Sequence, residues 1–191
     1  MDIVADLMKQ VATGDNLSLI SKSVGGDGKA VQSALGMGMP LLLGSMANTA
    51  SKPGGTEMLT KMLAQGGSSN PLDNLGGFLG NPAAAGGSGM VSTLLGSQMG
   101  GIQNTISQKT GLPPAVVGKV LELAAPMVMG YVGKMVGQQK MDTKSLTGLL
   151  GDQSKMALQA SPEAAGMAQQ LMGAQESSGG IGGIFKKVLG K

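Results

Sequence analysis

Apolar residues recur at helical spacing along most of the chain, and no run alternates apolar and polar positions as a half-buried strand would. Two stretches stand out because their second halves are apolar on nearly every side. Each contains a proline, Pro40 or Pro126, followed at once by an apolar run that ends in glycine. Such helices are buried on most sides in folded proteins. The pattern predicts an all-α fold class, a helical bundle around these two helices.

The two apolar stretches belong to an internal repeat, in which residues 20–48 align with residues 106–134. Seven of the 29 aligned positions are identical. The identical pairs are Ile20/Ile106, Ser21/Ser107, Gly25/Gly111, Val31/Val117, Leu35/Leu121, Pro40/Pro126 and Gly44/Gly130. Two copies of one supersecondary unit are the simplest explanation. We therefore expect a bundle built from two duplicated helical units.

Each unit is predicted to begin with a short helix, over residues 16–24 in the first unit and 102–110 in the second. These helices end at Gly25 and Gly111, since glycine readily adopts the left-handed conformation that closes a helix. The long helix that follows starts at Asp27, a suitable N-cap, or at the paired prolines in the second unit.

Pro40 and Pro126 fall inside the predicted long helices. Proline removes one backbone hydrogen bond from a helix and clashes with the preceding turn. We therefore expect proline-kinked long helices, with a kink or a restart of the helix at each proline.

The rest of the chain contains shorter predicted elements. Further helices are expected over residues 2–12, 56–65, 90–99, 142–150 and 162–174. The predicted organisation is an N-terminal helix with the first unit (1–65), a glycine-rich linker (66–89), the second unit (90–151), a C-terminal helix (152–176) and a basic amphipathic tail (177–191). We expect the two units to form one compact domain.

The motif that spans residues 31–44 resembles a known family. It reads Val-Gln-Ser-Ala-Leu-Gly, then Pro40, then Leu-Leu-Gly, and a second match covers residues 121–130 and a Leu-Leu-Gly that ends at Gly151. Residues 17–150 resemble the YidB-like bacterial domains of unknown function. The resemblance implies a helical bacterial domain without an assigned activity, so it assigns no functional residue.

The composition excludes several kinds of chemistry. The chain contains no Cys, His or Trp, and all 14 of its basic residues are lysines. Disulfides, the usual zinc sites and histidine-based catalytic triads are therefore excluded. The 11 acidic residues are mostly scattered singly, which disfavours an enzyme that relies on carboxylates and lysines alone. We expect no enzyme activity, no metal and no cofactor.

The charge distribution restricts the partners. Residues 1–176 contain 11 lysines and 11 acidic residues, so the formal net charge of +3 lies entirely in residues 177–191. Such a neutral body has no arginine, and the chain has only three aromatic residues, Phe78, Tyr131 and Phe185. Surfaces that bind nucleic acids are basic and often aromatic. We expect no nucleic-acid partner, and the sequence indicates no small-molecule substrate.

Apolar helices with so few charges must pack against each other or against sister subunits. The candidate residues for the core or for self-association surround the two prolines. They are Leu35, Met39, Pro40, Leu42, Gly44, Leu121, Pro126, Val128, Gly130 and Tyr131. We expect a homo-oligomer.

Other motifs have ordinary structural explanations. Residues 26–30 match a phosphate loop only in part and fit an inter-helix turn better. Glu122 follows Lys119 by three residues, which favours a solvated pair. Glycine pairs 76/80, 96/100 and 133/137 either allow helices to approach closely or reflect the composition. The methionines near the prolines (37, 39, 127, 129 and 135) are expected to fill a core or interface rather than bind copper.

The tail carries a short amphipathic pattern. Its apolar residues Ile184, Phe185, Val188 and Leu189 share one helical face, and Lys186 and Lys187 lie beside them in the sequence. This pattern suits weak docking to an anionic membrane surface or to a groove on a partner. Packing onto the protein itself or a neighbouring subunit, and a frayed end, are the alternatives.

The sequence favours a cytoplasmic location, because the acidic N-terminus lacks the order of a secretory signal. The uncharged run over residues 30–51 is long enough to span a bilayer, but its polar residues favour a buried core helix. The function that we expect is that of a non-catalytic structural protein, which self-associates through apolar helices into a ring or a filament. The alternative is a peripheral membrane-associated protein that uses the basic tail.

Overall fold

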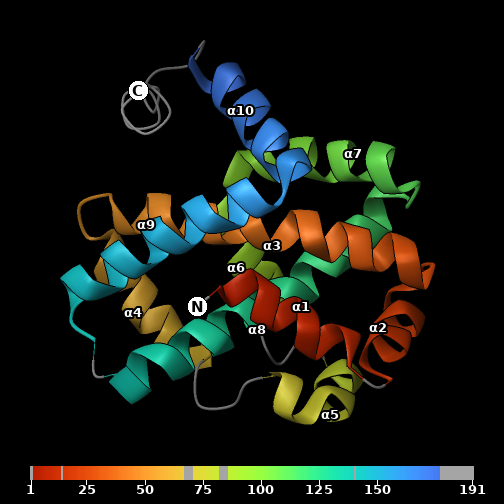
Figure 1. Ribbon diagram of the computed structural model, residues 1–191, viewed down its shortest axis with the longest axis horizontal. Coiled ribbons are helices and arrows are strands. Elements are labelled where there is room, and N and C mark those ends of the chain that lie inside the picture. The colour runs from red at the N-terminus through yellow and green to blue at the C-terminus, as the bar shows by residue number, and fades with distance from the viewer. Residues whose placement is uncertain (1, 14, 67–70, 82–85, 140, 177–191) are drawn as a thin grey trace.

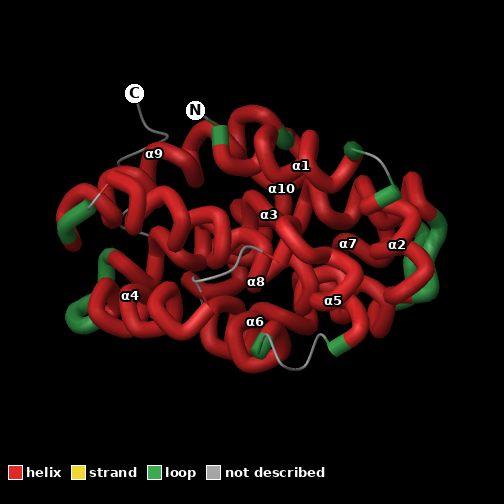
Figure 2. Tube along the Cα trace, turned by 90° about the horizontal axis from the view of Figure 1, so that it is seen from below, coloured by secondary structure: helices red, strands yellow, loops and turns green. Residues whose placement is uncertain are grey.

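The computed structural model describes residues 2–13, 15–66, 71–81, 86–139 and 141–176. Over these ranges the regular structure is helical and contains no strand, which confirms the all-α class (Figure 1). Figure 2 shows the short loops that join the helices.

The helices follow one another with few intervening residues. In chain order they are α1 (Ile3–Ala12), α2 (Asn16–Val24), α3 (Gly28–Ala50), α4 (Gly55–Gly66), the 3-10 helix η1 (Pro71–Asn74), α5 (Leu75–Gly80), α6 (Gly87–Leu95), the 3-10 helix η3 (Gly96–Gln98), α7 (Met99–Thr110), α8 (Pro114–Gln139), α9 (Thr143–Ala160) and α10 (Pro162–Glu176).

The two long helices, α3 and α8, lie in contact in the middle of the molecule, and the shorter helices surround them (Figures 1 and 2). The first half of the chain contains α3 and the second half contains α8. The helix that follows each of these long helices in the chain contacts the long helix of the other half. Helix α9 packs along α3, and α4 contacts α8 as well as α3. Both central helices are therefore covered by helices from both halves of the chain.

The sequence predicted the helix-end signals at Gly25, Asp27 and Gly111, but not the caps at Asp2 and Asp142. Helices α2 and α7 end at Gly25 and Gly111, with φ angles of 76° and 75° in the left-handed region. The carboxylates of Asp2, Asp27 and Asp142 accept hydrogen bonds from backbone N–H groups in the first turns of α1, α3 and α9. These side chains satisfy donors that have no partner within their own helix.

Pro40 and Pro126 lie inside α3 and α8, and each helix continues through its proline as one element. The restart that the sequence left open therefore does not occur. Both prolines are buried. Because a proline removes a hydrogen bond from the helix interior, side-chain packing around it must hold the two halves of the helix together.

The segment expected to be a linker, residues 66–89, contains regular structure. It holds η1, α5 and the beginning of α6. The Asn74 side chain accepts a hydrogen bond from the N–H of Gly77 at 3.1 Å and caps α5, and Leu75 is buried against α2 and neighbouring helices. The high glycine content of this segment hid α5 from the sequence pattern. Glycine lowers the intrinsic helix propensity, but it does not prevent a short helix that packs against its neighbours.

Helix α9 is longer than the pattern predicts, because it continues to Ala160 and includes residues assigned to a separate C-terminal helix. Its buried positions Leu146, Leu150, Gln153 and Ala157 continue at helical spacing. The buried glutamine interrupts the apolar pattern, so the sequence concealed the continuation.

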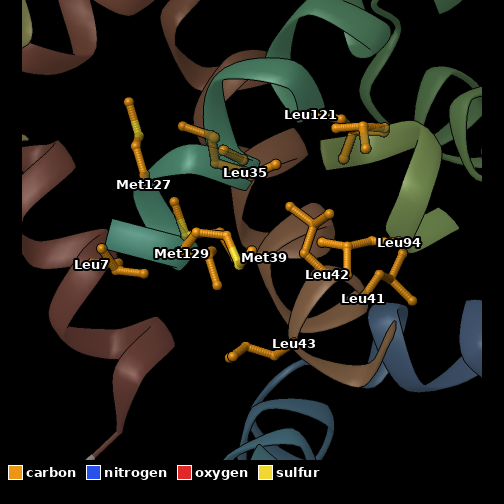
Figure 3. Close-up of a cluster of buried hydrophobic side chains, with 14 of the residues drawn as sticks. Leu7, Leu35, Met39, Leu41, Leu42, Leu43, Leu94, Leu121, Met127 and Met129 are labelled. Carbon is orange, nitrogen blue, oxygen red and sulfur yellow. The ribbon is translucent and has the colours of Figure 1, made fainter. Parts of the chain in front are cut away.

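The core is built from aliphatic side chains and methionines of α3 and α8, joined by those of α1 and α6 (Figure 3). Leu35, Met39, Leu42, Leu121 and Met129 have no exposed surface. Burying a side chain of this size contributes about 1.5–3 kcal/mol. The flexible methionines fill irregular space between the helices, as the sequence predicted.

Glycine is required where helices meet most closely. A Cβ atom at Gly38 of α3 would lie 2.7 Å from Leu121 Cδ2 of α8. A Cβ atom at Gly87, in the first turn of α6, would overlap the backbone carbonyl oxygen of Glu122 in α8. The Leu121 side chain near Gly38 can shift to make room for a Cβ atom, whereas the backbone of Glu122 near Gly87 cannot shift without moving α8.

The glycine pairs 76/80 and 96/100, and Gly137 of the third pair, do not bring helices together within the described chain. A Cβ atom at Gly76, Gly80, Gly96, Gly100 or Gly137 would have no neighbouring atom within 4 Å. These glycines lie at the surface. For them, the close-packing interpretation is wrong within one chain.

We expect Gly87→Ala to lower the free energy of unfolding by about 1–3 kcal/mol, because the added methyl group forces the backbones of α6 and α8 apart. Chemical denaturation followed by circular dichroism measures this change. Gly89→Ala is the matched control, since it lies in the same helix and its Cβ would meet open space. The control should raise stability by about 0.4–1 kcal/mol. Equal effects of the two substitutions would contradict the close approach.

Candidate functional site

The candidate residues around the two prolines lie inside the chain. Leu35, Met39, Pro40, Leu42, Leu121, Pro126, Val128 and Gly130 are buried, and Gly44 and Tyr131 are partly buried. Within a single copy, α3 and α8 thus provide most of the cover that their apolar surfaces need. A surface that binds a second copy must lie outside this set.

Among the described residues, two helices are apolar and long enough to cross a membrane, Gly28–Ala50 and Pro114–Gln138. In the structure, 61% and 72% of their most apolar windows are buried inside the protein. The core helices of folded proteins pass the same test, so this finding is weak evidence for a membrane span.

Helix α1 is held by an apolar face and by two polar contacts with distant parts of the chain. Ile3, Leu7 and Val11 have no exposed surface. The backbone N–H of Ile3, which has no acceptor within its own helix, donates a hydrogen bond of 2.8 Å to Oε1 of the buried Gln153 in α9. This bond fixes the start of α1 against α9.

The second polar contact joins α1 to α8. The hydroxyl group of Tyr131 donates a hydrogen bond to Asp6 Oδ2 at 3.1 Å. Partial burial raises the pKa of Tyr131 above its ordinary value, and the hydrogen bond to Asp6 and the negative charge of that carboxylate raise it further. Tyr131 therefore acts as a neutral donor at physiological pH, which suits a structural contact.

A groove of about 490 Å³ lies beside α1. Its lining comes from α1, α3, the ends of α7 and α9, and the start of α10. The apolar and small lining residues are Val4, Ala5, Met8, Gly36, Met37, Ala157 and Ala160, and the polar ones are Asp2, Ser33, Lys109, Ser161 and Glu163. Four of the lining residues, Ala5, Gly36, Ala157 and Ala160, are alanine or glycine, whose small side chains fill little of the space.

The polar groups of the groove do not converge as catalytic groups do. Asp2 accepts hydrogen bonds from the N–H groups of Val4 and Ala5, so it caps α1. The Ser161 hydroxyl accepts a hydrogen bond from the N–H of Ala164 and caps α10. Within the described ranges, no three His, Cys, Asp or Glu side chains are placed to hold a metal ion.

The structure explains two of the minor motifs. Residues 26 and 27 connect α2 to α3, Gly28 begins α3, and Asp27 caps it, so this segment is an inter-helix connection that runs into the first turn of a helix. Glu122 is partly buried, and its backbone carbonyl lies beside Gly87 of α6. Neither motif belongs to the groove.

A second surface feature is the lack of charge on α6, η3 and the adjoining part of α7. No residue from 86 to 108 is charged. Its exposed positions carry glycine, serine, threonine, asparagine and glutamine only. We call these exposed positions over residues 86–108 the uncharged surface.

The sequence alone did not predict the groove. Val4 and Met8 repeat four residues apart beside the core stripe of α1, and this second apolar stripe could have indicated a further contact surface. The opposite wall is formed by Ala157 and Ala160 near the end of α9, where no motif marks them. The tail residues 184–189 lie outside the described residues.

The sole tyrosine provides a direct test of the α1–α8 contact, because the chain has no Trp and its phenolate absorbance reports on Tyr131 alone. We expect Asp6→Asn to lower the pKa of Tyr131 toward its ordinary value of about 10, because the substitution removes the negative charge. Spectrophotometric titration measures this pKa. Asp15→Asn is the control, since Asp15 is an exposed acid without a side-chain capping bond.

The same contact makes stability depend on pH. Because folding raises the pKa of Tyr131, its contribution is fully present below about pH 10 and is lost as the pH rises through the folded-state pKa. Thermal melts at increasing alkaline pH should therefore show a steeper loss of stability in the wild type than in Asp6→Asn. Identical titration and melting behaviour of the two proteins would contradict the contact.

Comparison with known proteins identifies the family. A family model described as a bacterial protein of unknown function (DUF937) matches residues 6–135, more than half of the chain. No curated protein and no solved structure matches the chain. The matched region runs from α1 through most of α8 and agrees with the YidB-like resemblance. The chain therefore belongs to the DUF937 family of bacterial proteins.

Proposed function

We propose that this chain is a non-catalytic structural protein that self-associates into a homo-oligomer. The observation that carries the proposal is the uncharged surface. It covers α6, η3 and the adjoining part of α7 and has no lysine, aspartate or glutamate. Charged residues are depleted at the centres of protein interfaces, because an unpaired charge is costly to remove from water.

The shape of the uncharged surface also suits close contact with a second copy. Gly96 and Gly100 expose backbone, since a Cβ atom at either position would meet no atom within 4 Å. Among the described residues, the large hydrophobic side chains that are exposed form no comparable surface, because Leu19, Met58 and Met156 lie on three different helices. Self-association through a broad apolar patch is therefore less well supported than association through the uncharged surface.

The non-catalytic part of the proposal rests on the chemistry of the groove. Its carboxylate and hydroxyl groups at Asp2 and Ser161 already cap helices. Its remaining charged groups, Lys109 and Glu163, are exposed. Active sites usually exclude water around their charged groups, whereas these two side chains remain in contact with water.

The mode of assembly follows from which surfaces meet. If the uncharged surface meets the same surface of a second copy, a two-fold pair closes. If it meets a different surface, the contact repeats into a ring or a filament.

Sedimentation velocity of the full chain over a range of concentrations tests self-association. We expect species heavier than the 19.0 kDa monomer. Ser97→Lys, which places a charge on the uncharged surface, should weaken association by about tenfold or more, since it would bury an unpaired charge. Ser18→Lys on α2 is the control, because Ser18 is exposed and lies outside that surface. A monomer at every concentration would refute self-association, and equal effects of both variants would refute the role of this surface.

A further inference from the structure

We infer that the groove beside α1 receives the tail of a second copy, with residues 184–189 as the docking segment. This inference rests on the proposed self-association and names one contact that would produce it. It is carried by three features: the lining of the groove, the charge of the tail, and the length of chain between α10 and the docking segment.

The lining of the groove fits an amphipathic helix. Val4 and Met8 of α1 are partly exposed and offer apolar contacts, and the exposed Ala160 leaves room beside them. Met37 and Ala157 form the buried floor, with 5% and 1% of their surface exposed. The spacing of Ile184, Phe185, Val188 and Leu189 in the tail sequence would place them on one face if this segment docks as a helix. An apolar helical face placed in an apolar groove is a common mode of peptide recognition.

Charge complements this fit. The lining includes two carboxylates, Asp2 and Glu163, and one lysine, Lys109. The tail is the part of the chain with excess positive charge, and helical spacing would place Lys186 and Lys187 outside its apolar face. Attraction between these groups would orient the tail and speed its encounter with the groove.

The length of the chain favours a second copy over the same copy. The groove lies at the start of α10, where Ser161 and Glu163 line it, whereas the tail begins at the far end of this helix. Helix α10 has 15 residues, which corresponds to a length of about 22 Å.

Residues 177–183 are the only connection between α10 and the docking segment. Seven residues span at most about 25 Å when fully extended. Docking into the groove of the same copy would therefore need a nearly straight connection, with a low effective concentration. A second copy has no such constraint.

Photo-crosslinking in the full chain tests the inference. Phe185 is replaced by p-benzoylphenylalanine, whose excited ketone inserts into nearby C–H bonds and reacts readily with methionine. Illumination should give a covalent dimer, with crosslinked peptides that contain Met8 or Met37. Mixing isotopically heavy and light copies distinguishes links between copies from links within one copy. The same photoreactive residue at the exposed Leu19 of α2 is the control and should not label the groove.

A groove-filling variant provides the second measurement. Ala160→Trp should reduce crosslinking from position 185 by about tenfold, which corresponds to about 1.4 kcal/mol of docking free energy. Ala64→Trp is its matched control, because Ala64 is also an exposed alanine but lies on α4. Far-UV circular dichroism verifies that both variants keep their helical content.

The outcomes separate this inference from the proposed function. Light–heavy crosslinks to the groove that Ala160→Trp removes support the inference. Links within one copy, or links outside the groove, overturn it. If sedimentation still shows oligomers in that case, self-association stands without the tail. A membrane is tested by flotation with phosphatidylserine vesicles. If the chain binds vesicles, Phe185→Ala abolishes this binding, and no crosslinks to the groove form, the tail docks to a membrane and the inference is overturned.

Discussion

The contact between α3 and α8 is the constraint on which the rest of the structure depends. Both helices are apolar on most sides, and each contains a proline that removes a backbone hydrogen bond. Neither would be stable in water without cover on all sides. Gly38 lets Leu121 approach the axis of α3, so the two helices cover each other closely. The remaining sides must be covered by other helices.

This requirement explains the arrangement of the outer helices. A single amphipathic neighbour cannot surround a helix that is apolar all round, so both halves of the chain contribute to each central helix. Helix α9 from the second half covers α3, and α4 from the first half contacts α8 (Figure 1). The two halves are thereby interlocked, and most of the surface of each central helix is covered within one copy.

Helix α1 connects this core to the proposed docking groove. Its Ile3, Leu7 and Val11 complete the core, while Val4 and Met8 line the groove. The bonds to Gln153 and Tyr131 fix its position at two points. The wall formed by α9 and α10 lies beyond the region that matches the family model, so the groove combines a family element with a segment outside that match.

The sequence by itself determined the class of fold and the local signals within it. Helical spacing, capping by Asp27 and the left-handed glycines Gly25 and Gly111 depend on neighbouring residues, so they were readable along the chain. Tertiary structure alone decided that Pro40 lies within a continuous helix and that Gln153 bonds to Ile3. It also decided where the groove opens. These features depend on contacts between residues far apart in sequence, whose geometry no local pattern encodes.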